Sequence, residues 1–253
     1  MLDKFKLDGK IALVTGTSTG LGASMALALA EAGADVCCHS RNAVDTVKLC
    51  ESIESLGVRA FSVVGDLADK TAPKSIIESV VKEFGRIDIL VNNAGMIRRS
   101  PIIDFTEEDW ATVIEVNLSS VFRLTQEAGK LMVAQSSGKI INIASLLSFQ
   151  GGVFVPAYTA SKSAVAGLTK SCANEWAKHK VNVNAIAPGY IATNNTAALR
   201  NDETRNRQIL ERIPAERWGE PEDLSGATVF LASAASDYLH GHILTVDGGW
   251  MGR

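Results

Sequence analysis

Three side chains of the sequence stand at spacings that suit proton transfer. Ser145 closes an apolar run, and Tyr158 and Lys162 follow it, four positions apart from each other. Residues four apart on a helix share a face, so we expect the phenol and the ammonium to point the same way. A nearby ammonium lowers the pKa of a phenol from its usual value of about 10, and the serine hydroxyl could hydrogen-bond the same substrate oxygen. The three residues are therefore suited to moving a proton on and off an alcohol or a carbonyl.

A tyrosine and a lysine at this spacing also occur on ordinary solvated helix faces, so the pair needs support from elsewhere. A glycine loop near the start of the chain gives that support. Gly16, Gly20 and Gly22 follow an apolar run at 10–16 and precede an Ala/Leu-rich helix that we expect to reach about residue 32. A strand, a glycine loop and a helix N-terminus together point backbone N–H groups at a phosphate. The spacing is G-x-x-x-G-x-G rather than G-x-G-x-x-G, and we interpret it as a phosphate-binding loop.

The segments that position these residues alternate between apolar runs and helical patterns. Strands are predicted at residues 10–16, 35–39, 59–64, 87–91, 139–145, 181–187 and 243–247. Helices are predicted over 42–56, 71–84, about 106–134 (in one or two parts) and 221–232. A further helix is predicted to begin at Pro156 and to carry Tyr158 and Lys162. Residues 190–219 are polar and irregular in pattern, with arginines at five positions. Most of the strands are apolar on both faces, which is typical of a parallel sheet covered by helices on both sides.

This order of elements predicts an α/β fold, a single-domain doubly wound parallel sheet of about seven strands over residues 1–253. No linker-like stretch or shift of composition marks a domain boundary. Ligands of such folds bind at the carboxyl ends of the strands. Gly16, Asp66, Asn92, Ser145 and Pro188 all fall at predicted strand ends, so one crevice is expected to collect them.

Composition and charge narrow the possible partners. The chain is 46% hydrophobic and has a formal net charge of −3, so we expect no nucleic acid and no membrane among its partners. No apolar run reaches the ~18 residues of a membrane span. The N-terminus lacks the apolar centre of a signal peptide, so a cytoplasmic protein is expected. The four cysteines form no C-x-x-C pair and are interpreted as reduced thiols, and no metal site is predicted.

The motifs together resemble those of the short-chain dehydrogenase/reductase family, and the likeness covers nearly all of the chain. Residues 15–22 are similar to its cofactor loop, residues 92–95 to its N-N-A-G motif, and residues 188–193 to its P-G-x-x-x-T segment. Its catalytic tetrad is matched in type, order and spacing by Asn117, Ser145, Tyr158 and Lys162. The resemblance implies a nicotinamide-dependent oxidoreductase that interconverts a secondary alcohol and a ketone. It also implies a homotetramer.

The resemblance implies a role for each residue of the tetrad. Tyr158 would exchange the proton with the substrate oxygen, and Ser145 would orient that oxygen. Lys162 would bind the nicotinamide ribose and lower the pKa of Tyr158. Asn117 would hold a water molecule in a proton relay.

The cofactor is expected to lie along the strand ends. By the same resemblance, Asp66 would contact adenine and Asn93 would contact the adenine-side ribose. The whole set of implied cofactor-binding residues is Gly16, Thr17, Ser18, Thr19, Gly20, Leu21, Gly22, Ser40, Arg41, Asp66, Leu67, Asn93, Ala94, Gly95, Tyr158, Lys162, Pro188, Gly189, Ile191 and Thr193.

The end of the second predicted strand bears on the choice of cofactor. Members of the family that prefer NAD usually carry an acidic residue there, whereas this sequence has Ser40 followed by Arg41. A neutral residue and a guanidinium suit the 2′-phosphate of NADP(H), which we favour. The alternative is that Arg41 stacks on adenine or points to solvent. The glycine loop also lacks a further basic residue seen in many NADP-dependent relatives, so NAD(H) stays possible.

A narrower resemblance concerns the substrate. Residues 92–99, 141–152, 174–179 and 187–195 are similar to a group of sugar-acid enzymes, the 2-deoxy-D-gluconate 3-dehydrogenases, also described as 2-dehydro-3-deoxy-D-gluconate 5-dehydrogenases. A sugar acid carries a carboxylate, which Arg98 and Arg99 could bind, and Gln150, Asn194 and Asn195 could hydrogen-bond its hydroxyls. The alternative for the two arginines is a solvent-facing pair or a subunit contact.

Other functions remain open from the sequence alone. A 3-oxoacyl-thioester reductase would use the same fold and tetrad. Such an enzyme would need a basic surface to bind its carrier protein, and the net charge of −3 gives little support for one. A reductase of a uronate keto acid derived from alginate is a third possibility. A non-catalytic cofactor-binding module would predict the loss of Tyr158 or Lys162, and both are present.

Overall fold

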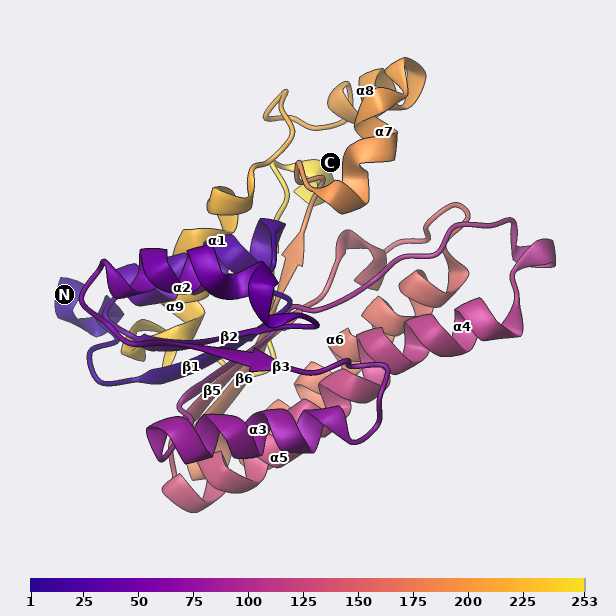
Figure 1. Cartoon of the computed structure of the whole chain (residues 1–253). Coiled ribbons are helices and arrows are strands. Elements are labelled where there is room, and N and C mark those ends of the chain that lie inside the picture. Colours follow the sequence, from indigo (N-terminus) through magenta and orange to yellow (C-terminus); the bar gives the residue numbers. More distant parts are fainter. Residues whose placement is uncertain (253) are drawn as a thin grey trace.

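The computed structural model describes residues 1–252 and is built around one seven-stranded sheet (Figure 1). The strand order is β3-β2-β1-β4-β5-β6-β7, and every neighbouring pair is parallel. The strands are β1 (Ile11–Thr15), β2 (Asp35–Ser40), β3 (Ala60–Val64), β4 (Ile89–Asn92), β5 (Gly138–Ile143), β6 (Val181–Pro188) and β7 (Ile243–Val246). The predicted α/β fold with a doubly wound parallel sheet is therefore confirmed.

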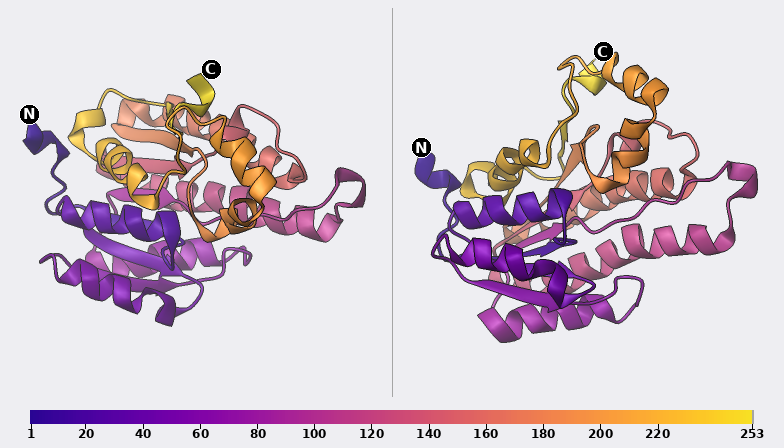
Figure 2. Two further views of the ribbon diagram at one scale, coloured as in Figure 1. Left: turned by 90° about the horizontal axis from the view of Figure 1, so that it is seen from above. Right: turned by 45° about the horizontal axis from the view of Figure 1, so that its top comes forward.

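Helices cover both faces of the sheet, as Figures 1 and 2 show. One face carries α1 (Gly20–Glu31), α2 (Val47–Glu54) and α9 (Ser225–Ala232). The other carries α3 (Ala72–Phe84), α4 (Glu107–Ile114), α5 (Ser120–Gln135) and α6 (Pro156–Trp176). Every residue of β1, β4 and β6 is buried, which explains why these strands are apolar rather than alternating.

The strand order reverses between β1 and β4, because β2 and β3 extend the sheet on one side and β5 to β7 on the other. A crevice forms at the carboxyl ends of the strands at such a reversal, and ligands of open α/β sheets bind there. The glycine loop follows β1 and Ser145 follows β5, while Asn92 and Pro188 end β4 and β6. These predicted strand-end residues therefore share one edge of the sheet.

Two segments add detail to their predicted form. The helical region predicted at about 106–134 consists of two helices, α4 and α5, joined by a π-helical turn at Glu115–Ser119. The polar segment 190–219 contains two short helices, α7 (Ala197–Asn201) and α8 (Glu203–Leu210). They lie beyond the carboxyl edge of the sheet, next to the C-terminal residues (Figures 1 and 2). Only Ile209 of α8 is buried, so this helix has almost no apolar periodicity for sequence analysis to detect.

Within residues 1–252, no helix combines the length and the apolar character needed to cross a membrane. The same residues contain no group of three or more side chains placed to hold a metal ion.

Candidate active site

The glycine loop after β1 is shaped by close backbone approach. A Cβ on Gly22, in the first turn of α1, would lie 2.1 Å from the carbonyl oxygen of Gly16. Gly16 itself has a φ of +71°, in the left-handed region that favours glycine. Glycine therefore lets α1 begin directly against the loop, where its free N–H groups and its dipole attract a phosphate. This cradle fits the diphosphate of a dinucleotide.

Asn93 holds the glycine loop to the end of β4. Its side-chain Nδ2 donates to the carbonyl oxygens of Thr15 and Gly16, at 2.8 and 3.1 Å. The hydroxyl of Thr15 accepts from the backbone N–H groups of Asn93 and Ala94, at 3.0 Å each. The amide of Asn93 is thus engaged with backbone, and the ribose contact implied for this residue stays a prediction.

His39, which sequence analysis did not single out, ties the glycine loop to its other neighbour. Its buried imidazole accepts from the N–H of Gly16 through Nδ1, at 3.4 Å, and its Nε2 lies 3.0 Å from the carbonyl oxygen of Gly65. Because Nδ1 accepts, the proton of the neutral ring is on Nε2 and points at Gly65. Burial lowers the pKa of His39, which favours this neutral form. The sequence did contain a signal for this role, because His39 is a polar residue directly after the apolar residues 36–38 of its strand.

The predicted adenosine end of the site lies beside β2 and β3. Ser40 is buried, and its hydroxyl donates to the carbonyl oxygen of Asn42. Arg41 is exposed and makes no hydrogen bond or ion pair with any other residue of 1–252. Asp66 is exposed and its Oδ1 accepts from the N–H of Ala68, at 2.9 Å. A free guanidinium next to a neutral serine fits the 2′-phosphate of NADP(H).

The remaining predicted residues of the loops differ in exposure. Ser18 and Thr19 are exposed. Thr17 is buried, and its hydroxyl donates to the carbonyl oxygen of His39 at 3.1 Å. Leu67 is buried in the core between the sheet and α3. The side chains of Thr17 and Leu67 therefore point into the protein. Only their backbone atoms are available to contact a cofactor.

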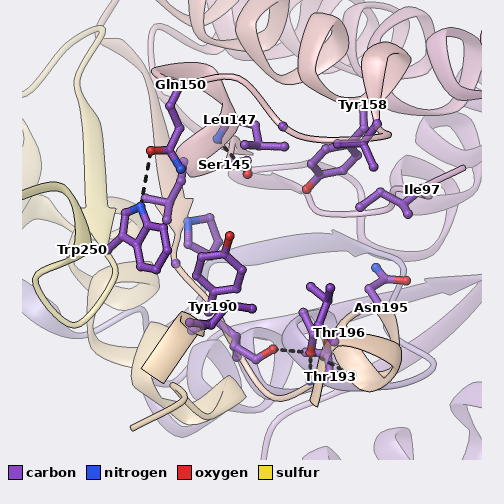
Figure 3. Close-up of a pocket in the computed structure, with 18 of the residues that line it drawn as sticks. Ile97, Ser145, Leu147, Gln150, Tyr158, Tyr190, Thr193, Asn195, Thr196 and Trp250 are labelled. Atoms are coloured by element: carbon purple, nitrogen blue, oxygen red, sulfur yellow. Dashed lines mark hydrogen bonds between the residues drawn. The ribbon is translucent and has the colours of Figure 1, made fainter. Parts of the chain in front are cut away.

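Tyr158, Lys162 and Ser145 come together as predicted. Pro156 is the first residue of α6, and the helix places Tyr158 and Lys162 on one face, with the ammonium 5.6 Å from the centre of the tyrosine ring. The ammonium donates to the carbonyl oxygen of Ile143 at 2.5 Å. Figure 3 shows Ser145 and Tyr158 near each other on the wall of a pocket.

The pKa values at this wall have identifiable causes. Burial raises the pKa of Tyr158, whereas the hydroxyl of Ser145 and the charge of Arg99 lower it. Burial also lowers the pKa of Lys162 to about 8. Tyr158 is therefore a protonated phenol at neutral pH, and the cation that acts on it here is Arg99. The expected effect of Lys162 on the pKa of Tyr158 stays a prediction.

Asn117 lies in the π-helical turn between α4 and α5 and is fully buried. Its Oδ1 accepts from the N–H of Met96, and its Nδ2 donates to the carbonyl oxygen of Met96, both at 2.9 Å. The same Nδ2 lies 3.4 Å from the hydroxyl of Ser161 on α6. The side chain therefore fixes the loop after Asn93 against α6, and its role in holding a water molecule stays a prediction.

A cavity of about 490 Å³ adjoins Tyr158, within the usual size range for a small-molecule site. The cofactor-side residues Leu21, Pro188, Gly189, Ile191 and Thr193 border it. Of the predicted substrate residues, Arg99, Gln150 and Asn195 line it. Arg98 and Asn194 are not among the lining residues, and Arg98 instead pairs with Asp109 at 3.1 Å.

The cavity also has residues that sequence analysis did not assign to the site. Arg205, Gln208 and Arg212 reach it from α8 and the turn after it, and Tyr190 and Trp250 form an aromatic wall. The arginine-rich composition of residues 190–219 was the sequence signal for Arg205 and Arg212.

A phosphate cradle lies at the switch point of the parallel sheet, next to a pocket lined by Ser145 and Tyr158, and Lys162 is buried beside the tyrosine ring. This arrangement is typical of a nicotinamide-dependent oxidoreductase. The comparisons agree with this class. A family model described as enoyl-(acyl carrier protein) reductase matches residues 16–251. The chain belongs to the short-chain dehydrogenase/reductase family, as its motifs predicted, and is an oxidoreductase that acts on CH–OH groups.

Several relatives are similar over the full length of the chain. The 2-dehydro-3-deoxy-D-gluconate 5-dehydrogenase of Dickeya dadantii is 54% identical over 100% of both chains. The enzyme of the same name from Bacillus subtilis is 56% identical over 99% of this chain and 98% of its own.

Solved structures of similar proteins share the fold. A gluconate 5-dehydrogenase from Burkholderia cenocepacia, in complex with NADP and tartrate, is 40% identical and has a TM-score of 0.96 over 100% of this chain and 99% of its own. An Agrobacterium tumefaciens protein with bound NADP, proposed to be a 2-deoxy-D-gluconate 3-dehydrogenase, is 54% identical. Its TM-score is 0.92 over 99% of each chain.

Proposed function

We propose that this oxidoreductase interconverts a secondary alcohol and a ketone on a sugar acid of the 2-dehydro-3-deoxy-D-gluconate type. The observation that carries the proposal is the cavity, which joins the Tyr158 wall to the polar side chains of Arg99, Gln150 and Asn195. Guanidinium groups suit a carboxylate, and amide groups suit hydroxyls. Relatives named for this sugar acid, at 54% and 56% identity, support the same substrate class.

We propose a part in the reaction for each residue of the predicted tetrad. In the direction of reduction, Tyr158 donates its proton to the carbonyl oxygen, and Ser145 hydrogen-bonds that oxygen. Bound nicotinamide supplies the hydride. The proposed role of Lys162, which the carbonyl oxygen of Ile143 holds, is to bind the nicotinamide ribose, and Asn117 keeps the loop after Asn93 in position. Because burial keeps Tyr158 protonated at neutral pH, it is ready to act as the acid.

NADP(H) is the proposed cofactor. Arg41 is exposed beside Ser40, with its guanidinium unpaired within residues 1–252, as a 2′-phosphate requires. The NADP bound in the two solved relatives gives further support. Substitution Arg41→Ala should raise the KM for NADPH and leave the KM for NADH nearly unchanged.

We also propose, from the family resemblance, a homotetramer in the cytoplasm. Support for association comes from β7 (Ile243–Val246), which forms an edge of the sheet and has only partly buried residues. Size-exclusion chromatography with light scattering tests the assembly, and a monomer at micromolar concentration would contradict it.

The proposed function is tested by initial rates with two substrates. The sugar acid 2-dehydro-3-deoxy-D-gluconate is assayed with NADP⁺ and NAD⁺, and an acetoacetyl thioester with NADPH and NADH. Turnover of the sugar acid, faster with the phosphorylated cofactor, is the expected result. Turnover of the thioester alone would replace the substrate assignment with an acyl-thioester reductase.

A further inference from the structure

The substrate cavity has a cation at each of two ends. At the near end, Arg99 donates through Nη2 to the carbonyl oxygen of Asn195 at 3.0 Å, and its charge acts on Tyr158. At the far end, the guanidinium of Arg212 lies 4.0 Å from the centre of the Trp250 ring. Figure 3 shows Trp250 and Tyr158 on opposite sides of the pocket. An anionic substrate therefore has two positions in which its charge can be neutralised.

Arg212 is held in place by an aromatic wall. Trp250 is buried, its Nε1 donates to Oε1 of Gln150 at 3.3 Å, and its ring lies 4.6 Å from that of Tyr190. An arginine stacked on an aromatic ring keeps the N–H groups at its edge free for a carboxylate. The guanidinium of Arg212 makes no hydrogen bond or ion pair with any other residue of 1–252, so its N–H donors are unused within that range.

Arg205 adds a second charge at the far end. It lies on α8, and its Nη1 donates to Oε1 of Gln208 at 2.9 Å, a residue that also lines the cavity. The charges of Arg205 and Arg212 both act on Tyr190, so they converge on the same part of the wall. The near end differs, since Arg99 already has a backbone partner there.

We propose that Arg212, assisted by Arg205, binds the carboxylate of the substrate at the end of the cavity far from Tyr158. This inference rests on the proposed function and extends it to the choice of carbon. In a 5-keto acid, the carbonyl carbon and the carboxylate lie near opposite ends of the sugar chain. In a 3-keto acid, a single carbon separates them. A carboxylate held at the far end brings C5, and not C3, to Tyr158 and Ser145.

The first test is kinetic. Arg212→Ala should raise the KM for 2-dehydro-3-deoxy-D-gluconate about 10-fold or more, as expected for a lost charge-assisted hydrogen bond, with little change in kcat or in the Kd for NADP⁺. Arg212→Lys should restore part of the affinity. The matched control is Arg207→Ala, because Arg207 is on the same helix, is exposed, and pairs with Glu211 outside the cavity. Equal KM values for the Arg212 and Arg207 variants would overturn the proposal.

The charge itself is tested with the methyl ester of the same sugar acid. Wild-type enzyme should lose affinity for the ester, and Arg212→Ala should treat acid and ester alike. A KM that Arg212→Ala raises equally for both compounds would show a packing defect instead of a lost carboxylate contact. Arg212→Gln, which keeps a long side chain over Trp250 without the charge, replaces the alanine variant if that variant melts at a lower temperature.

A binding measurement separates this inference from the proposed function. D-gluconate is titrated calorimetrically into the NADPH complex, with the uncharged D-glucitol as its counterpart. Wild-type protein should bind gluconate in preference to glucitol, and Arg212→Gln should lose that preference. This outcome would support the far-end carboxylate site even if 2-dehydro-3-deoxy-D-gluconate were not turned over. A preference lost in Arg99→Gln and kept in Arg212→Gln would place the carboxylate at the near end and overturn the proposal.

Discussion

The two ends of the active-site crevice are built from different kinds of contact. At the cofactor end, backbone groups of the glycine loop are fixed by side-chain partners, with the half-buried Asn93 on one side and the buried His39 on the other. At the substrate end, exposed side chains such as Arg205 and Arg212 project from the short helix α8 and the turn after it. A substitution at the cofactor end must therefore move backbone, whereas one at the substrate end changes only what the pocket binds.

Tyr158 and Lys162, the proposed catalytic residues, lie where these two regions meet. Tyr158 and Lys162 come from the long helix α6, whose first turn borders the substrate cavity, and Lys162 is anchored to the carbonyl oxygen of Ile143 at the end of β5. The chemistry thus depends on the fixed region, and the substrate preference depends on the exposed one. Four substitutions, in order of decreasing effect, test this division.

The largest effect is expected for Tyr158→Phe. It removes the proton donor and leaves the ring, so kcat should fall about 10³-fold, within the range for loss of a general acid. The Kd for NADPH should stay close to that of the wild type, because the glycine loop is untouched. Single-turnover kinetics and fluorescence titration of NADPH measure the two quantities. Near-native turnover in this variant would show that another group donates the proton.

Gly22→Ala should damage the cofactor end through the backbone. Its Cβ would lie 2.1 Å from the carbonyl oxygen of Gly16 and 2.5 Å from Nδ2 of Asn93, so the loop has to shift. We expect a loss of about 1–3 kcal/mol in the free energy of unfolding, as for an overpacked site, and at least about 10-fold weaker NADPH binding.

The control for this variant is Gly167→Ala on α6, an exposed helical position where an added Cβ meets no atom within 4 Å. That change should raise the stability by about 0.5–1 kcal/mol, because alanine has the better helix propensity. Thermal unfolding compares the two variants. Similar melting temperatures would contradict the close approach at Gly22.

The same division explains which parts of the molecule the sequence could predict. A cofactor loop requires glycines, and buried parallel strands require apolar runs, so those features were visible as residue types at fixed spacings. The ends of the strands were therefore predicted well enough to gather Gly16, Ser145 and Pro188 at one edge. Arg98, in contrast, was predicted to bind the substrate but does not line the cavity, because its side chain turns to Asp109 while the adjacent Arg99 lines the cavity.

The missing parts lacked a periodic signal. The π-helical turn that holds Asn117 has the same composition as an α-helix, so the sequence did not show where it would occur. The helix α8 has one buried residue, and its arginines therefore resembled a solvated loop. His39 sits inside a strand, and its contacts with Gly16 and Gly65 come from residues that are remote in the sequence.

A smaller effect is expected from the titration of His39. Burial lowers its pKa in the folded protein below the ordinary value of 6.5, so the unfolded chain takes up a proton first as the pH falls. Stability is therefore lost from about pH 6.5 down to the lowered folded pKa, with a slope of up to about 1.4 kcal/mol per pH unit for one group. Protonation would also replace the acceptor for the N–H of Gly16 by a donor.

His39→Gln should be less stable than the wild type at pH 7.5 and should depend less steeply on pH between 6.5 and 5. Urea unfolding at several pH values, with NADPH titration at each, measures both properties. An unchanged slope in the variant would assign the acid sensitivity to other groups.

The smallest effect is expected for Arg98→Ala. This variant tests whether an arginine outside the cavity lining matters as much as one that lines the cavity. Its ion pair with Asp109 joins side chains that are 51% and 38% exposed, and such pairs contribute about 0.2–1 kcal/mol. Arg98→Ala should therefore change the melting temperature by a few degrees at most, and leave the KM for the sugar acid unchanged. The adjacent Arg99→Ala should lower kcat, because Arg99 alone of the two acts on Tyr158. Equal kinetics of the two variants would contradict the claim that Arg99 acts on the reaction and Arg98 does not. Lining the cavity would then not decide which exposed side chains affect turnover.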